Sequence, residues 1–139
     1  MTQPISYTSE FLPEITIAVV FSDNPQYEKL EPMFNEYGYG FMVPNKNLVI
    51  VDGEQIINNF DEDVLKFIEA HEIAHIILNH DGPRNEKEEL DADLGAYILL
   101  KQKDKLGAIK SLIEHFKQRH GIKFDEKLLE RVKKYFYQY

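Results

Sequence analysis

The spacing of apolar residues changes part-way along the chain, from short runs typical of strands to long segments with helical spacing. A mostly β-branched apolar run covers residues 15–21 between two turn-forming sequences, which predicts a buried strand. Two further runs, 41–43 and 48–51, flank a Pro-Asn-Lys-Asn sequence and predict a hairpin. Residues 25–37 begin with proline and are followed by glycine, so we expect a helix between the first strand and the hairpin.

The rest of the chain predicts four helices, near residues 60–79, 85–103, 104–119 and from 125 onward. Asn59 with Glu62, and Asn85 with Glu88, have the spacing of an Asn-based capping box at the start of the first two. Apolar side chains cover more than half of the circumference of the first helix. We therefore expect that helix in the middle of the fold.

The order of these elements predicts an α+β fold. We expect a small, mostly antiparallel sheet packed on a helical layer, with helix 60–79 at its centre. The 139 residues contain no repeat, low-complexity segment or linker, and the length suits one domain. We therefore predict a single domain over residues 1–139.

Composition narrows the chemistry and the partners. The chain has no cysteine, which excludes thiolate metal sites, disulfides and a cysteine nucleophile. The net charge is −8 and the sixteen basic residues are dispersed, so we expect no nucleic-acid partner. No apolar stretch approaches the ~18 residues of a membrane span, and the first residues lack the pattern of a secretory signal. These features predict a cytoplasmic protein.

His71-Glu72-Ile73-Ala74-His75 matches the H-E-x-x-H pattern inside the predicted central helix. Residues four apart on a helix project from one face, so both imidazoles can bind one metal ion. Glu72 lies close enough to reach a water at the metal without binding the metal itself. Burying these polar groups is costly without partners. The pattern therefore predicts a zinc site for hydrolysis, with one ion per chain.

A catalytic zinc normally has a third protein ligand, and two positions compete for this role. Asp81 stands at the ligand position of the metzincin arrangement, but Leu78 replaces the glycine that would turn the chain there. Glu89 lies on the next predicted helix, with Asp93 one turn later on the same face. A glutamate can complete the metal shell while an aspartate accepts the ring N–H of a liganding histidine.

H-E-x-x-H followed by E-x-x-x-D on a second helix is the pattern of gluzincin peptidases. Residues 48–100 resemble the ImmA/IrrE-type peptidases and the very short minigluzincins, through HEIAHIILNH and EELDADLGAYILL. The resemblance implies a zincin-like fold with Glu89 as third ligand and Asp93 as the partner of His71. Asp91 stands where these families often have a second glutamate, so it remains an alternative ligand.

These observations predict a zinc-dependent endopeptidase. Glu72 would be the general base that takes a proton from the attacking water and passes it to the leaving amine. An extended peptide or protein substrate would pair with strand 41–43 or 48–51. The alternatives are a non-catalytic metal-binding module of regulatory or immunity type, against which the intact Glu72 argues, and a helical protein with a chance motif.

The remaining candidate residues have structural interpretations. His115 and His120 lack metal-ligand spacing relative to the motif, so we expect them at the surface. Tyr97 is interpreted as a core residue. The apolar stripe of the last segment is interpreted first as core packing, and comprises Leu128, Leu129, Val132, Tyr135 and Phe136.

The end of the chain carries more aromatic residues than one core-facing stripe uses, because Tyr137 and Tyr139 follow Phe136. Minigluzincins are known as latent forms that are blocked by their own chain. The resemblance therefore suggests that the segment after about Arg131 covers the cleft, or docks on a second copy, and holds the enzyme inactive.

Overall fold

The computed structural model describes residues 3–37, 40–43, 45–55, 62–80 and 85–137. The chain divides into two compact units, residues 1–61 with the sheet and residues 62–139 with most of the helices. A four-stranded, mostly antiparallel sheet together with these helices confirms the α+β class. No helix among the described residues is both long and apolar enough to cross a membrane.

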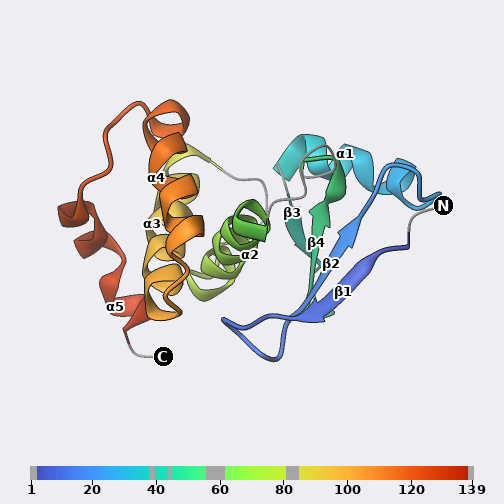
Figure 1. Cartoon of the computed structure of the whole chain (residues 1–139), viewed down its shortest axis with the longest axis horizontal. Coiled ribbons are helices and arrows are strands. Elements are labelled where there is room, and N and C mark those ends of the chain that lie inside the picture. The colour runs from blue at the N-terminus through green and yellow to red at the C-terminus, as the bar shows by residue number, and fades with distance from the viewer. Residues whose placement is uncertain (1–2, 38–39, 44, 56–61, 81–84, 138–139) are drawn as a thin grey trace. The chain divides into compact units, whose positions relative to one another are not determined.

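The sheet has the strand order β1-β2-β4-β3 (Figure 1). The strands are β1 (Ile5–Thr8), β2 (Thr16–Val20), β3 (Gly40–Val43) and β4 (Leu48–Asp52). β3 and β4 form the expected antiparallel hairpin, and β2 is the expected buried strand. β1 has an exposed and polar pattern, and its sequence alone did not reveal it.

β2 and β4 are parallel neighbours, which requires a crossover between them. Helix α1 (Tyr27–Tyr37) and strand β3 lie in that connection. In register, Ile17 faces Val49 and Val19 faces Val51, and all four are completely buried. The alternation of these residues with less buried ones gives the sheet one apolar face.

The second unit is built on three helices that pack against one another: α2 (Glu62–Ile77), α3 (Glu86–Gln102) and α4 (Leu106–His120). α2 is buried from Phe67 to His75, as its apolar circumference predicted. The cap of α3 has the expected form, because Asn85 Oδ1 accepts from the Glu88 N–H at 2.8 Å and Asn85 Nδ2 donates to Glu88 Oε1 at 2.8 Å. Asn59, the other expected cap, lies outside the described residues.

The last segment differs from the continuous helix that its sequence predicted. It forms a 3₁₀ helix, η2 (Glu126–Arg131), followed by the short α5 (Lys133–Phe136). A separate 3₁₀ turn, η1 (Gly53–Gln55), follows β4 in the first unit. A 3₁₀ helix places residues three apart on the same side. Leu129 and Val132, three residues apart, are both buried.

The apolar stripe of this segment packs into the helical unit. Phe136 is fully buried against α3, where a Cβ at Gly95 would come 2.2 Å from its Cζ. Tyr97 is buried, as expected, and its hydroxyl donates to Glu126 Oε1 at 2.9 Å. Tyr135 remains 43% exposed. Core packing is therefore confirmed for the buried positions of the stripe.

Candidate metal centre

The two histidines of the motif project from one face of α2, as four-residue spacing on a helix requires. The side chains of His71 and His75 are buried, and their Nε2 atoms lie 3.1 Å apart. Glu72 is also buried, and the potential ligand atoms of the three residues lie within 4.8 Å of one another. The helix therefore brings two imidazoles and a carboxylate to one point.

Glu89 reaches the same point from the first turn of α3. Its Oε2 lies 2.9 Å from Nε2 of His71, and its Oε1 lies 3.2 Å from Nε2 of His75. Asp91, the alternative from the sequence, has an oxygen 3.1 Å from Nη2 of Arg131. Asp81, the metzincin-like alternative, lies outside the described residues. Of the two candidates that the structure describes, Glu89 is the one that it brings to both histidines.

Asp93 lies one turn beyond Glu89 on α3 and holds the other side of His71. Nδ1 of His71 donates to Asp93 Oδ1 at 2.6 Å. This carboxylate is completely buried, so it needs several partners to offset the loss of water. Because a carboxylate can only accept, it fixes the proton of a neutral His71 on Nδ1 and leaves Nε2 unprotonated, as a nitrogen that could bind a metal.

The other partners of Asp93 come from the last turn of α4, which sequence reasoning did not connect to the site. Nε of Arg119 donates to Asp93 Oδ2 at 2.9 Å, and Nε2 of His120 donates to the same oxygen at 2.5 Å. The expectation that His120 lies at the surface was wrong, because only 7% of its side chain is exposed. The expectation holds for His115, which is exposed.

The helical spacing of apolar residues in α4 did indicate that His120 would be buried. Ala108, Leu112 and Phe116 form a buried stripe with a spacing of four residues, and His120 is the next position of that stripe. Spacing relative to the H-E-x-x-H motif carried no such information, because α4 reaches Asp93 only through the packing of the helices.

A family model described as Peptidase family M48 matches residues 12–100. The chain belongs to Peptidase family M48. Neither the curated proteins nor the solved structures yielded a match. Membership of this family implies a metallopeptidase. The matched region runs from before β2 to within the last turn of α3 and includes His71, Glu72, His75, Glu89 and Asp93, whereas Arg119 and His120 lie beyond it.

The geometry of this M48 site fits a bound metal ion. Ligand atoms about 2.1 Å from a tetrahedral centre are about 3.4 Å apart. The separations between the two imidazole Nε2 atoms and the Glu89 oxygens are 2.9, 3.1 and 3.2 Å. Two of these groups are nitrogen atoms whose lone pairs would face each other without a cation or a proton between them. The donor set therefore suits a divalent cation.

The close contacts between the histidines and the carboxylates shift the pKa values of His71, Glu89 and Asp93. Burial alone would lower the pKa of His71, but Asp93 and Glu89 outweigh it and raise the pKa from 6.5 to about 10. Burial alone would raise the pKa values of Glu89 and Asp93, but the histidines, with Arg119 at Asp93, hold both well below their ordinary range. Without a metal, Glu89 and Asp93 are thus ionised, and the His71 ring carries a second proton in addition to the one on Nδ1. A metal ion bound at Nε2 would displace that proton.

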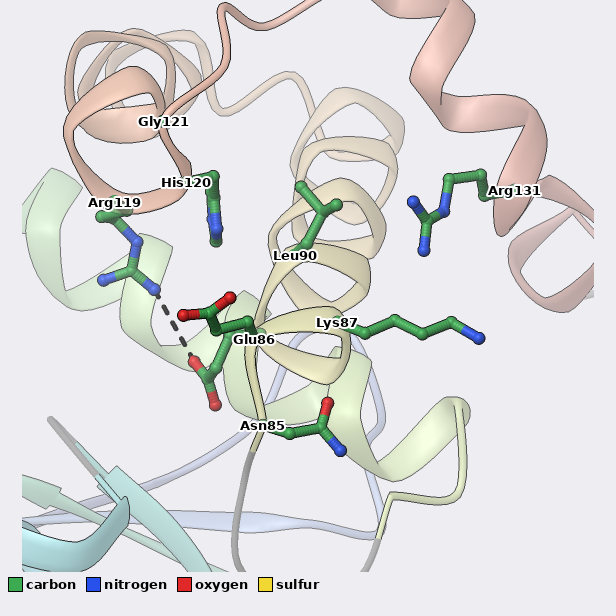
Figure 2. Close-up of a pocket in the computed structure, with 9 residues that line it drawn as sticks. Asn85, Glu86, Lys87, Leu90, Arg119, His120, Gly121 and Arg131 are labelled. Atoms are coloured by element: carbon green, nitrogen blue, oxygen red, sulfur yellow. Dashed lines mark ion pairs between the residues drawn. The ribbon is translucent and has the colours of Figure 1, made fainter.

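A cavity of about 900 Å³ opens beside Glu89. Figure 2 shows Arg119 and His120 on one side of α3, and Lys87 and Arg131 on the other side. The dashed line there marks the ion pair between Nη2 of Arg119 and Oε2 of Glu89, which are 3.8 Å apart. Glu89 therefore borders a cavity whose lining includes both cationic and acidic side chains.

Proposed function

We propose that this protein is a zinc-dependent endopeptidase of the gluzincin type. His71, His75 and Glu89 would hold one zinc ion per chain, as three protein ligands do in catalytic zinc sites. The observation that carries the proposal is the convergence of two buried imidazoles and the Glu89 carboxylate in a chain of an M48 metallopeptidase family. Nitrogen and oxygen donors without cysteine suit zinc. The bound ion would supply Lewis-acid activation of water and of the scissile carbonyl.

Glu72 is the general base in this proposal. It is 3% exposed, and its carboxylate belongs to the same buried group as both histidines. From this position it would take a proton from the attacking water and deliver it to the leaving amine. A site that only bound metal for regulation or stability would not need a fourth acidic or imidazole group there. The position of Glu72 therefore favours an enzyme over a non-catalytic module.

Asp93 would orient His71, and Arg119 and His120 would hold Asp93. The buried hydrogen bonds among these residues support this role. Partners of this kind set the tautomer of a liganding histidine and raise its basicity.

The sheet limits how an extended peptide could pair with it. β4 has β2 on one side and β3 on the other, so it has no open edge for a further strand. β3 ends the sheet, and of the two strands considered it is the one suited to strand addition. We propose that main-chain hydrogen bonds to β3 hold a peptide or protein substrate.

Latency through the C-terminal segment remains part of the proposal in a narrower form. Val132 and Phe136 are buried in the helical unit, whereas Tyr135 and Tyr137 are 43% and 59% exposed. The exposed tyrosines are therefore the candidates to cover a cleft or to contact a second copy. Changing both to Ser should raise peptide hydrolysis without unfolding the protein. Unchanged hydrolysis by a folded, zinc-loaded variant would contradict latency.

The proposed function is tested with zinc-loaded protein and its Glu72→Gln variant. We expect one zinc per chain in both, and hydrolysis of a casein-derived peptide mixture only where Glu72 is present, at a rate that latency lowers in the unmodified protein. Glu72→Gln removes the proton acceptor and no ligand. Metal-free protein after preparation in zinc would contradict the proposal, and hydrolysis by Glu72→Gln at the unmodified rate would show that Glu72 is not the base.

A further inference from the structure

Helix α2 ends in a way that folds the chain back over its own last turn. Asn79 has a φ of 60°, in the left-handed region. The His80 N–H donates to the His75 carbonyl at 3.0 Å, and the Asn79 N–H donates to the Ile76 carbonyl at 3.0 Å. These two bonds define a Schellman motif with Asn79 in the position usually held by glycine.

In a Schellman motif, the residue that follows the left-handed residue packs its side chain against the residue five positions earlier than itself. Here these two residues are His80 and His75. If the helix continued, the nine-residue spacing would place His80 on the opposite side of the helix from His71. The left-handed turn at Asn79 ends the helix and brings His80 back to His75.

The two imidazoles meet through their Nδ1 atoms, which are 2.8 Å apart. The ring centroids are 5.1 Å apart, and the rings are inclined by 61°. His75 is 1% exposed and His80 is 15% exposed at the side chain. This is a short hydrogen bond, largely shielded from water, on the side of His75 that faces away from Glu89.

Proton accounting determines the direction of this hydrogen bond in a metal-loaded site. A neutral imidazole has one N–H and one acceptor nitrogen. If Nε2 of His75 binds a metal, the proton of that ring is on Nδ1. Nδ1 of His80 must then accept it, and His80 carries its own proton on Nε2.

His80 lies beside the start of α3. Its Nδ1 lies 3.7 Å from Oε2 of Glu88, and Oε1 of Glu88 accepts from the Asn85 side chain. Glu88 of the α3 capping box therefore lies near the same Nδ1 atom that meets His75, beyond hydrogen-bond distance from it. The two ligand histidines therefore have different outer partners, a carboxylate at His71 and an imidazole at His75.

We propose that His80 is a positioning residue of the metal centre, which directs Nε2 of His75 at the ion by accepting the Nδ1 proton of that ring. The inference rests on the proposed function, because it requires a metal ion at His71, His75 and Glu89. Replacement of an outer partner of this kind typically weakens metal binding about 10–100-fold.

The test measures zinc affinity of the full chain by competition with a chelating dye. His80→Ala and His80→Phe should each bind zinc about 10–100-fold more weakly. His80→Gln should recover most of the affinity, because its Oε1 can accept the same proton. His115→Ala, an exposed histidine on α4, is the matched control and should bind zinc as the unmodified chain does.

The three substitutions at position 80 separate hydrogen bonding from packing. Phe keeps a ring without an acceptor, so unmodified affinity in a folded His80→Phe variant overturns the inference. If His80→Ala unfolds, the zinc affinities of the His80→Phe and His80→Gln variants are sufficient to test the inference. Equal weakening in Phe and Gln also overturns it, since the loss would then not follow the acceptor.

Nitrogen NMR of the zinc-loaded protein gives a second readout that a merely structural role would not produce. We expect His75 with its proton on Nδ1 and His80 with its proton on Nε2. A His80 ring with a proton on Nδ1 overturns the inference. Unmodified protein that binds no zinc would contradict the proposed function and this inference together, whereas normal binding with unchanged His80 variants would contradict this inference alone.

Discussion

The guanidinium of Arg119 lies 2.9 Å from the carboxylate of Asp93, although 26 residues separate them in the chain. Through Asp93, this cation holds the Nδ1 side of His71. It also lies 5.6 Å above the ring of Phe67, one turn before His71 on α2. The end of α4 thus connects the two helices that carry the metal centre.

Arg119→Ala should weaken both the fold and the site. It leaves the buried Asp93 with fewer donors, and an unsatisfied buried group costs about 1–3 kcal/mol. We expect a loss of that size in urea unfolding of the metal-free protein, with a drop in zinc affinity. Arg131→Ala is the control, because Arg131 lines the same cavity but pairs with Asp91. Equal effects of the two substitutions would contradict the role of Arg119.

Substitutions of the acidic residues should rank the candidate ligands. Glu89→Ala should abolish tight zinc binding, because it removes a proposed ligand. Asp93→Asn should weaken zinc about 10–100-fold, as a change in an outer partner. Asp91→Ala and Asp81→Ala should have little effect on zinc content measured by elemental analysis. A stronger effect of Asp81→Ala than of Glu89→Ala would establish the metzincin-like arrangement.

Gly95 and Phe136 should be energetically coupled. A Cβ at position 95 would come 2.2 Å from Phe136 Cζ and 3.0 Å from the Ala74 Cβ, so Gly95→Ala forces a shift in a packed core. Such overpacking costs about 1–3 kcal/mol, and Phe136→Ala costs about 3–5 kcal/mol. Urea unfolding of the double variant should show a smaller loss than the sum. Strict additivity would show that Phe136 does not pack against α3 in solution.

Deletion of the residues after Arg131 should unfold the helical unit, because it removes the buried Val132 and Phe136. Circular dichroism and thermal unfolding would detect this directly. A deleted protein that keeps its helix content and its cooperative transition would contradict the core-packing assignment and would favour a regulatory segment.

The metal-free protein should be most stable between about pH 5 and 6.5. The pKa of His71 is raised from 6.5 to about 10, so its contribution is complete below 6.5 and is lost as the pH rises towards 10. The pKa values of Glu89 and Asp93 are lowered from 4.5 and 3.8, so their contributions are present above these values and are lost as the pH falls. His71→Gln should flatten the alkaline side of the stability curve. An alkaline side that stays as steep in this variant would assign it to another group.

Much of the fold was predictable because its elements depend on local pattern. The β-branched run became β2, the hairpin became β3 and β4, and the apolar circumference of residues 60–79 became the buried α2. β1 was missed because its polar, exposed sequence is a strand only through pairing with β2. The 3₁₀ form of η2 was missed because residues three apart lie on one side of a 3₁₀ helix and of an α-helix alike, so an apolar stripe does not distinguish the two.

The sequence by itself determined the motif on α2, since four-residue spacing on a helix places His71 and His75 on one face whatever surrounds them. The approach of Glu89 and Asp93 followed from spacing together with a family resemblance. Only the tertiary structure decided the outer partners. His120 and Arg119 meet Asp93 because α4 packs on α3, and His80 meets His75 because Asn79 adopts a left-handed conformation. Contacts across helices and reversals at a single residue are not encoded in helical periodicity, which describes one element at a time.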